Sequence, residues 1–333
     1  MTDKSVFTAE NIAISVLGGL AAAVIFIVVA RGGWGGLVLA HLAPLPIMII
    51  SLGYGVRHGA SAALLATAVL SVYPHPVVGM TYSLMVAGPA WLASYAASGA
   101  PRGKRDLITT NFAGWAGLAP AAFIALVVSL WLIVASLSFG SLDEALNPIR
   151  ARAFIILDGM IKNNNNLSGK FDPAALSGSV AMAIPAFIAS YTTTIHVLNL
   201  WIAGRLTQAS GLLTRPLPDI SESFRLPKAV GGVFLSGLAL SLFSGPSAAI
   251  GYVMTATMGL ILSIQGLAVA HARLRTRPNG VVLLAIVYFL VGLLGWPLIL
   301  FIFIGLADLI FDFRYRKSSD AAGQGSDAAP KPD

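Results

Sequence analysis

The chain has 333 residues, of which 56% are hydrophobic and only 11% are charged. Soluble domains carry roughly a quarter charged residues, so a soluble fold of this length could not hide so much apolar surface, and lipid must be its solvent. The chain has no cysteine, which excludes disulfides, thiolate metal sites and a cysteine nucleophile. The formal net charge of +7 fits basic residues retained on the cytoplasmic face of a membrane better than it fits binding to nucleic acid.

Apolar runs separated by short polar breaks predict an all-helical transmembrane bundle of about eight to ten segments, including short hairpins. The first run lacks the strongly positive start of a signal peptide and is long enough to span, so we expect a retained helix. Two runs, 60–72 and 229–243, are shorter than a full span and are expected to be tilted, re-entrant or buried among other helices. The expected segments are Ile12–Ala30, Leu37–Leu52, Ala60–Val72, Val77–Ala97, Phe112–Leu137, Leu176–Ile202, Ala229–Phe243, Ala248–His271, Val281–Leu294 and Pro297–Phe311.

The last apolar run, 281–311, is predicted to be a hairpin that breaks at Gly295-Trp296-Pro297, because proline interrupts a helix. With ten segments and a cytoplasmic N-terminus, 16 of the 21 basic residues fall on the cytoplasmic side. This asymmetry is the one that the positive-inside rule requires, so we expect both termini to be cytoplasmic.

Residues 1–317 are expected to form a single transmembrane domain, followed by a disordered cytoplasmic tail over 318–333. Residues 138–175 form a long extracytoplasmic loop in this topology. Within this loop, Ala153–Ile161 is apolar but too short to span, which is typical of an interfacial helix. The loop is either a lid over an external cavity or a plain connector carrying that helix.

A polar stripe interrupts the segment Leu176–Ile202. Thr192, His196 and Asn199 fall on one face of the expected helix. They are candidate substrate-binding residues, and histidine can also relay a proton because it titrates near neutral pH. The alternative is that they form hydrogen bonds between helices.

Two further polar residues are candidates for substrate binding. Gln265 must find a partner if it is buried, and that partner is either a substrate or another helix. His41 precedes Pro44 and Pro46, and broken helices mark binding sites in transporters. A kinked packing helix is the alternative for this second site.

Two carboxylates, Asp308 and Asp312, lie four residues apart near the end of the last segment, with Arg314 and Arg316 just beyond. They either carry ions or protons, or pair with the neighbouring arginines. The sequence contains no P-loop, no His-Glu-x-x-His zinc site and no Gly-x-Ser-x-Gly elbow. We therefore expect no enzyme activity, no metal site and no cofactor.

Small residues spaced four apart let the backbones of membrane helices approach each other closely. Two such pairs stand out in the sequence, Ala62 with Ala66 and Gly232 with Ser236. Both pairs are candidates for helix–helix contacts.

Three stretches of the C-terminal third carry a family resemblance: Ser223-Phe-Arg-Leu-Pro227, Gln265-Gly-Leu-Ala-Val-Ala-His271 and Gly305-Leu-Ala-Asp-Leu-Ile-Phe-Asp-Phe-Arg314. With these the chain resembles, over about Pro44 to Arg316, the YybS-like family of predicted bacterial membrane proteins, a domain of unknown function. Asp308, Asp312 and Arg314 belong to the closing motif. The resemblance implies a multi-pass protein of the bacterial inner membrane.

That family is distantly similar to the substrate-binding S-components of energy-coupling-factor transporters, which capture vitamins or metal ions. No ligand motif is matched, so the resemblance implies no ligand residue. The leading hypothesis is therefore capture or transport of a small molecule, and the rival is a non-transporting scaffold or assembly factor. The expected partners are the lipid bilayer, a small-molecule ligand and another membrane protein. A transporter predicts a cavity near the midplane lined by Thr192, His196, Asn199 or Gln265, whereas packing of these side chains against other helices favours a scaffold.

Overall fold

The computed structural model describes residues 9–28, 33–98, 112–164, 169–213 and 219–314. Within these residues the elements are helices and no strand occurs, as expected in lipid, where a helix satisfies its own backbone polar groups. In chain order they are α1 (Ala9–Ile27), α2 (Trp34–Ala40), α3 (Leu45–Gly53), α4 (Val56–Val72), α5 (Pro76–Tyr82), the π-helical turn η2 (Ser83–Ala87), α6 (Gly88–Ser98), α7 (Phe112–Phe139), α8 (Leu142–Lys162), α9 (Pro173–Ala209), α10 (Ile220–Ser223), α11 (Ala229–Leu240), α12 (Pro246–Leu274), α13 (Gly280–Leu294) and α14 (Leu298–Phe311).

The described residues include five helices long and apolar enough to cross a membrane, together with five shorter apolar helices. Each of the ten expected segments overlaps one of them, so the predicted helical membrane bundle is confirmed. The segment Leu37–Leu52 is broken, because α2 ends at Ala40 and α3 begins only after Pro44. The proline-rich break that the sequence indicated is therefore real. The expected tail, 318–333, lies outside the described residues.

The expected hairpin at the end of the chain is confirmed. α13 ends at Leu294, Gly295 adopts a φ of +68°, and Pro297 precedes the first residue of α14. Glycine suits this turn because a positive φ is strained for other residues. With 15 and 14 residues, the two helices are each about 22 Å long, shorter than the roughly 30 Å hydrocarbon core of a bilayer.

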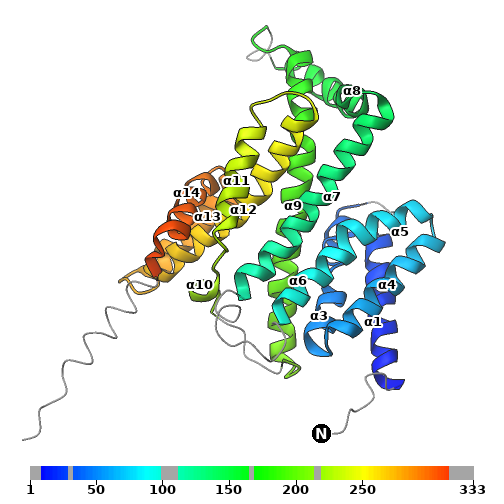
Figure 1. Ribbon diagram of the computed structural model, residues 1–333, viewed down its shortest axis with the longest axis vertical. Coiled ribbons are helices and arrows are strands. Elements are labelled where there is room, and N and C mark those ends of the chain that lie inside the picture. Colours follow the sequence, from blue (N-terminus) through cyan, green and yellow to red (C-terminus); the bar gives the residue numbers. More distant parts are fainter. Residues whose placement is uncertain (1–8, 29–32, 99–111, 165–168, 214–218, 315–333) are drawn as a thin grey trace, which may run out of the picture.

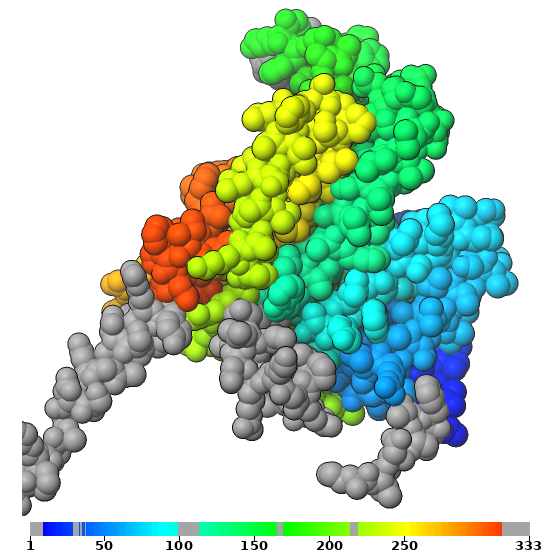
Figure 2. All heavy atoms as spheres, viewed as in Figure 1, coloured from blue at the N-terminus to red at the C-terminus, as the bar shows by residue number. Residues whose placement is uncertain are grey.

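The long helices α7, α9 and α12 lie between two groups of shorter ones (Figure 1). α1 to α6 flank them on one side, and α11, α13 and α14 lie on the other, as the space-filling view also shows (Figure 2). The 37-residue α9 ties the bundle together because it contributes to all three apolar cores. Ala203 packs with α1–α6, Val197 against the core of α11, α12 and α14, and Ala189 with α7 and α12.

The loop 138–175 contains a longer helix than expected. α8 begins at Leu142, well before Ala153, because the side chain of Ser141 caps its first turn by accepting a hydrogen bond from the Glu144 amide at 3.1 Å. Leu142 and Leu146 are buried in the core that α7 and α9 share. Figure 1 shows α8 lying across the ends of these helices. Its role as a lid stays a prediction.

The two candidate pairs of small residues have different outcomes. Ala62 and Ala66 are fully buried on α4, and a Cβ placed on Gly19 of α1 would lie 2.7 Å from the Ala62 carbonyl oxygen. The close packing predicted for this pair is therefore confirmed. The prediction for Gly232 and Ser236 was wrong, because both residues are exposed and a Cβ on Gly232 would meet nothing within 4 Å.

The tightest approach between α12 and α14 uses two glycines that the spacing argument did not select. A Cβ on Gly266 would lie 2.0 Å from the carbonyl oxygen of Phe301, and one on Gly305 would lie 2.0 Å from the carbonyl oxygen of Leu262. Neither position can hold a larger residue without separating the helices. Helix association in lipid depends on such close packing.

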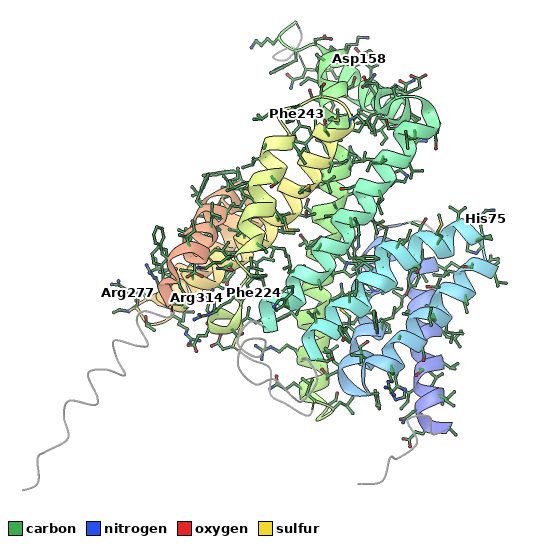
Figure 3. All side chains as sticks on the ribbon, viewed as in Figure 1. His75, Asp158, Phe224, Phe243, Arg277 and Arg314 are labelled. Atoms are coloured by element: carbon green, nitrogen blue, oxygen red, sulfur yellow. The ribbon has the colours of Figure 1, made fainter. Side chains whose placement is uncertain are left out.

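Charged residues gather at the two ends of the bundle. Arg277 and Arg314 lie at one end in Figure 3, and Asp158 on α8 lies at the opposite end. This arrangement agrees with charges kept at two membrane faces. Which face is cytoplasmic stays a prediction.

Candidate functional site

His196 lies in the middle of α9 and is 1% exposed. Its Nδ1 atom lies 2.8 Å from the carbonyl oxygen of Thr192, and its Nε2 atom lies 3.1 Å from the carbonyl oxygen of Val86 in η2. A π-helical turn departs from the regular α-helical hydrogen-bond pattern. His196 therefore links α9 to the α5–α6 span, and Thr192 contributes its backbone carbonyl.

The predicted residues Asn199 and His41 lie together, next to His196 along α9. Asn199 donates from Nδ2 to the carbonyl oxygens of His41 and Ile195, both at 2.8 Å. The His41 ring in turn lies 2.6 Å, Nε2 to hydroxyl, from Tyr191. This set holds the break between α2 and α3 against α9, because His41 is the C-cap of α2. The sequence reasoning missed Tyr191, although it stands one residue before Thr192.

A second polar cluster surrounds Asp308, which is 3% exposed. Its Oδ2 atom accepts hydrogen bonds from Gln265 Nε2 at 2.9 Å and from Arg314 Nη2 at 2.8 Å. We call these three residues the Asp308 clamp. Because Gln265 is on α12, the clamp joins that helix to the end of α14. Asp308 Oδ1 and Arg314 Nε are buried without a partner in the described part of the chain.

The Asp308 clamp binds the backbone of the segment Asp219–Pro227, which we call the hook. Gln265 Oε1 accepts the amide of Leu226 at 2.9 Å. Arg314 donates to the carbonyl oxygens of Ser221 and Phe224, at 2.8 and 2.7 Å. The hook includes α10, but its remaining residues are not helical, and Phe224 and Leu226 are buried. Buried backbone groups that no helix satisfies need such partners.

Ion pairs at the surface fasten the hook further. Arg225 lies 3.1 Å from Asp312, Nη1 to Oδ1, and Arg275 pairs with Asp219 and Glu222. The hydrogen bond from the Ser221 hydroxyl, and then the Arg275 guanidinium, hold the pKa of Asp219 below its ordinary value. All three pairs have at least one carboxylate that is about half exposed or more, so each pair contributes little to stability.

The two aspartates of the closing motif therefore form ion pairs with arginines, but only one of them pairs with an arginine next to it in the sequence. Asp308 pairs with Arg314, as expected. Asp312 instead pairs with Arg225 from the hook, and Arg316 lies outside the described residues. The sequence did not lead us to predict that the hook binds these side chains. It could have been noticed, because Ser223–Pro227 is one of the stretches that carry the family resemblance.

A groove of about 610 Å³ lies between the first half of α9 and the first third of α12. Its walls include Gly178, Ala183 and Ala186 from α9, with Tyr252 and Thr255 from α12. None of the five predicted substrate-binding residues lines it. The structure brings four of them, His196, Asn199, His41 and Gln265, into contacts with other parts of the bundle in two separate clusters, whereas the printed contact of Thr192 is with His196 on its own helix.

The apolar bundle, with its charges at two ends and its polar side chains bound between helices, is that of a multi-pass helical membrane protein. The sequence matches the model of the family described as predicted membrane protein (DUF2232) over residues 20–309. The chain therefore belongs to this family, and the YybS-like resemblance is confirmed. No curated protein and no solved structure matches the chain, so the similarity to S-components has no support from them.

Proposed function

We propose that the chain is a non-enzymatic membrane scaffold or assembly factor. One observation carries the proposal: His196, Asn199 and Gln265 direct their hydrogen bonds to backbone groups or side chains of other helices. A transport pathway needs polar groups that are free to bind a substrate. In the described part of the chain, both ring nitrogens of His196, the amide nitrogen of Asn199 and both polar atoms of the Gln265 amide are in contact with other groups of the fold, and the Asn199 Oδ1 atom is the one polar atom of this set without a partner.

The rival hypothesis, capture or transport of a small molecule, needs the cavity near the midplane that the sequence argument specified. The groove between α9 and α12 does not supply it, because its lining contains neither His196 nor Gln265. The rival therefore predicts that these polar contacts open to admit a substrate. The scaffold proposal predicts that they stay closed.

A thermal-shift screen of the purified full-length protein against vitamins and divalent metal ions tests the choice. We expect no ligand to raise the melting temperature, because only a ligand that binds the folded state raises it, and a scaffold has no site for these ligands. Stabilisation by a ligand that is lost in His196→Phe or Gln265→Leu, but kept in the exposed control Tyr95→Phe on α6, would overturn the scaffold proposal in favour of capture.

We also propose that the protein lies in the bacterial inner membrane with both termini cytoplasmic. The native chain has no cysteine, so single cysteines report topology directly. We expect Leu294→Cys, at the hairpin tip, to react with an impermeant maleimide from the outside. We expect the same of Asp158→Cys on α8. Arg277→Cys serves as the cytoplasmic control. Labelling of Leu294→Cys only from the cytoplasmic side would contradict the ten-segment topology.

A further inference from the structure

The α13–α14 hairpin is too short to cross a bilayer of ordinary thickness. Its two ends lie near charged residues at one end of the bundle, where Arg277 and Arg314 are found together (Figure 3). Asp312, directly after α14, is 53% exposed in its pair with Arg225, and an exposed ion pair is too costly for hydrocarbon. The arms of 15 and 14 residues rise about 22 Å from that level. The turn between them therefore lies about 8 Å short of the far side of a hydrocarbon core of roughly 30 Å.

The packing of α14 against α12 also places the turn inside the membrane. The two helices run in the same direction, towards the end that carries Arg277 and Arg314 (Figure 3). Three contact pairs are each separated by 43 residues in the sequence: Gly259 with Ile302, Leu262 with Gly305, and Gln265 with Asp308. This offset places Leu298, the first residue of α14, near the level of Thr255. α12 begins at Pro246, about 13 Å further out at the helical rise of about 1.5 Å per residue.

The tip of the hairpin presents polar backbone at this depth. Pro297 has no N–H, and the Trp296 amide donates to the carbonyl oxygen of Leu294 at 2.8 Å. The carbonyls of Gly292 and Leu293 therefore lose the amides that a continuing helix would supply. Leu293 and Trp296 are 66% and 59% exposed. Irregular backbone is not tolerated where it faces hydrocarbon, and a tryptophan ring prefers the level of the headgroups. The tip therefore fits headgroups and water rather than acyl chains.

We propose that the bilayer is thinned locally beside α13 and α14, so that the headgroups of the leaflet opposite Arg277 descend to Trp296. A bilayer commonly accommodates a short apolar segment by thinning. The thinning is confined to this edge, because α9 and α12, with 37 and 29 residues, are about 55 and 43 Å long. Local thinning lowers the cost of a polar group in the membrane. This property suits the assembly role proposed above, but the thinning itself does not depend on that role.

Phe187 on α9 offers a matched position on the thick side of the protein. It follows Ala186, which lines the same groove as Thr255, and its side chain is 60% exposed. Phe187 thus lies close to the level of the hairpin tip. Cysteines placed singly at Leu293 and at Phe187 therefore differ in the thickness of the bilayer around them rather than in their depth along the bundle.

The full-length variants are reconstituted into dioleoyl-phosphatidylcholine liposomes and treated with an impermeant maleimide. Asp158→Cys, at the end of the bundle opposite Arg277 (Figure 3), reports the fraction of molecules whose far face is accessible, and each rate is normalised to it. We expect Leu293→Cys to react at least several-fold faster than Phe187→Cys. Equal normalised rates would overturn the proposal, because they would indicate a bilayer of uniform thickness around the protein.

Bilayer thickness provides a second readout. Dierucoyl-phosphatidylcholine has longer acyl chains, so a bilayer that does not adapt would bury the tip more deeply. We expect Leu293→Cys to remain reactive in this lipid, and loss of its reaction there would contradict local thinning. A monodisperse Leu293→Cys protein that reacts in neither lipid would also refute the proposal. It would indicate that another copy of the chain covers the tip in place of headgroups.

Discussion

Replacing Asp308 with asparagine tests whether the Asp308 clamp holds the membrane bundle together. The change removes the negative charge that Arg314 faces, while the side chain keeps nearly the same shape. The side chains of Asp308 and Arg314 are only 2% and 7% exposed. Breaking a buried ion pair by removing one partner costs about 3–5 kcal/mol, because the remaining charge is left uncompensated. We expect a loss near the lower value, since asparagine can still accept one hydrogen bond.

The matched control is Asp312→Asn, four residues further along. Asp312 also pairs with an arginine, Arg225, but its side chain is 53% exposed. Exposed pairs contribute about 0–1 kcal/mol. Asparagine also tolerates the positive φ of +49° at this position. The two variants therefore make the same chemical change in a buried and in an exposed pair.

The assay is equilibrium unfolding of both variants by SDS in mixed micelles, followed by tryptophan fluorescence. A double variant, Asp308→Asn with Arg314→Gln, should lose less stability than Asp308→Asn alone, because neither charge is then left unpaired. Equal losses for Asp308→Asn and Asp312→Asn would refute the reasoning. They would mean that the buried cluster contributes no more than a surface pair.

Three further predictions follow from single positions. Gly266→Val should separate α12 from α14 and lower the temperature at which the detergent-solubilised protein aggregates, whereas Gly232→Val should be nearly neutral; similar losses for both would contradict the close-approach argument. Tyr82→Phe should be neutral or stabilising in SDS unfolding, because the Tyr82 hydroxyl is fully buried without a partner in the described residues, and a strong loss would show that this hydroxyl is bonded. The lowered pKa of Asp219 means that its bonds stabilise the hook above the ordinary value of 3.8 and are lost as the pH falls through the folded value. The protection factors of the hook amides, each taken against the intrinsic exchange rate at the same pH, should therefore fall on acidification below about pH 4, and Asp219→Asn should remove that dependence.

Much of the architecture could be predicted from the sequence because lipid imposes a simple rule. A segment that crosses the membrane must be apolar and helical, so composition alone separates the ten apolar runs from their connections. The break at Gly295-Trp296-Pro297 was equally readable, since proline and glycine act on the local backbone. α8 was underestimated because its first half, from Leu142, is amphipathic rather than apolar.

The roles of the polar residues could not be predicted in the same way. The sequence predicted Thr192, His196 and Asn199 on one face of a helix. It could not predict which other segments pack against that face. Val86 is 110 residues from His196, and only the packing of η2 against α9 brings the two within hydrogen-bonding distance.

The sequence by itself determined a lipid-embedded helical chain with its charges at the two ends, because these properties follow from composition and local periodicity. Only the tertiary structure decided that Gln265, Asp308 and Arg314 form one clamp on the hook, and that the groove lies elsewhere. The physical reason is that a buried polar group must form a hydrogen bond with some partner. Which residue becomes that partner depends on which distant segments the folded helices bring near.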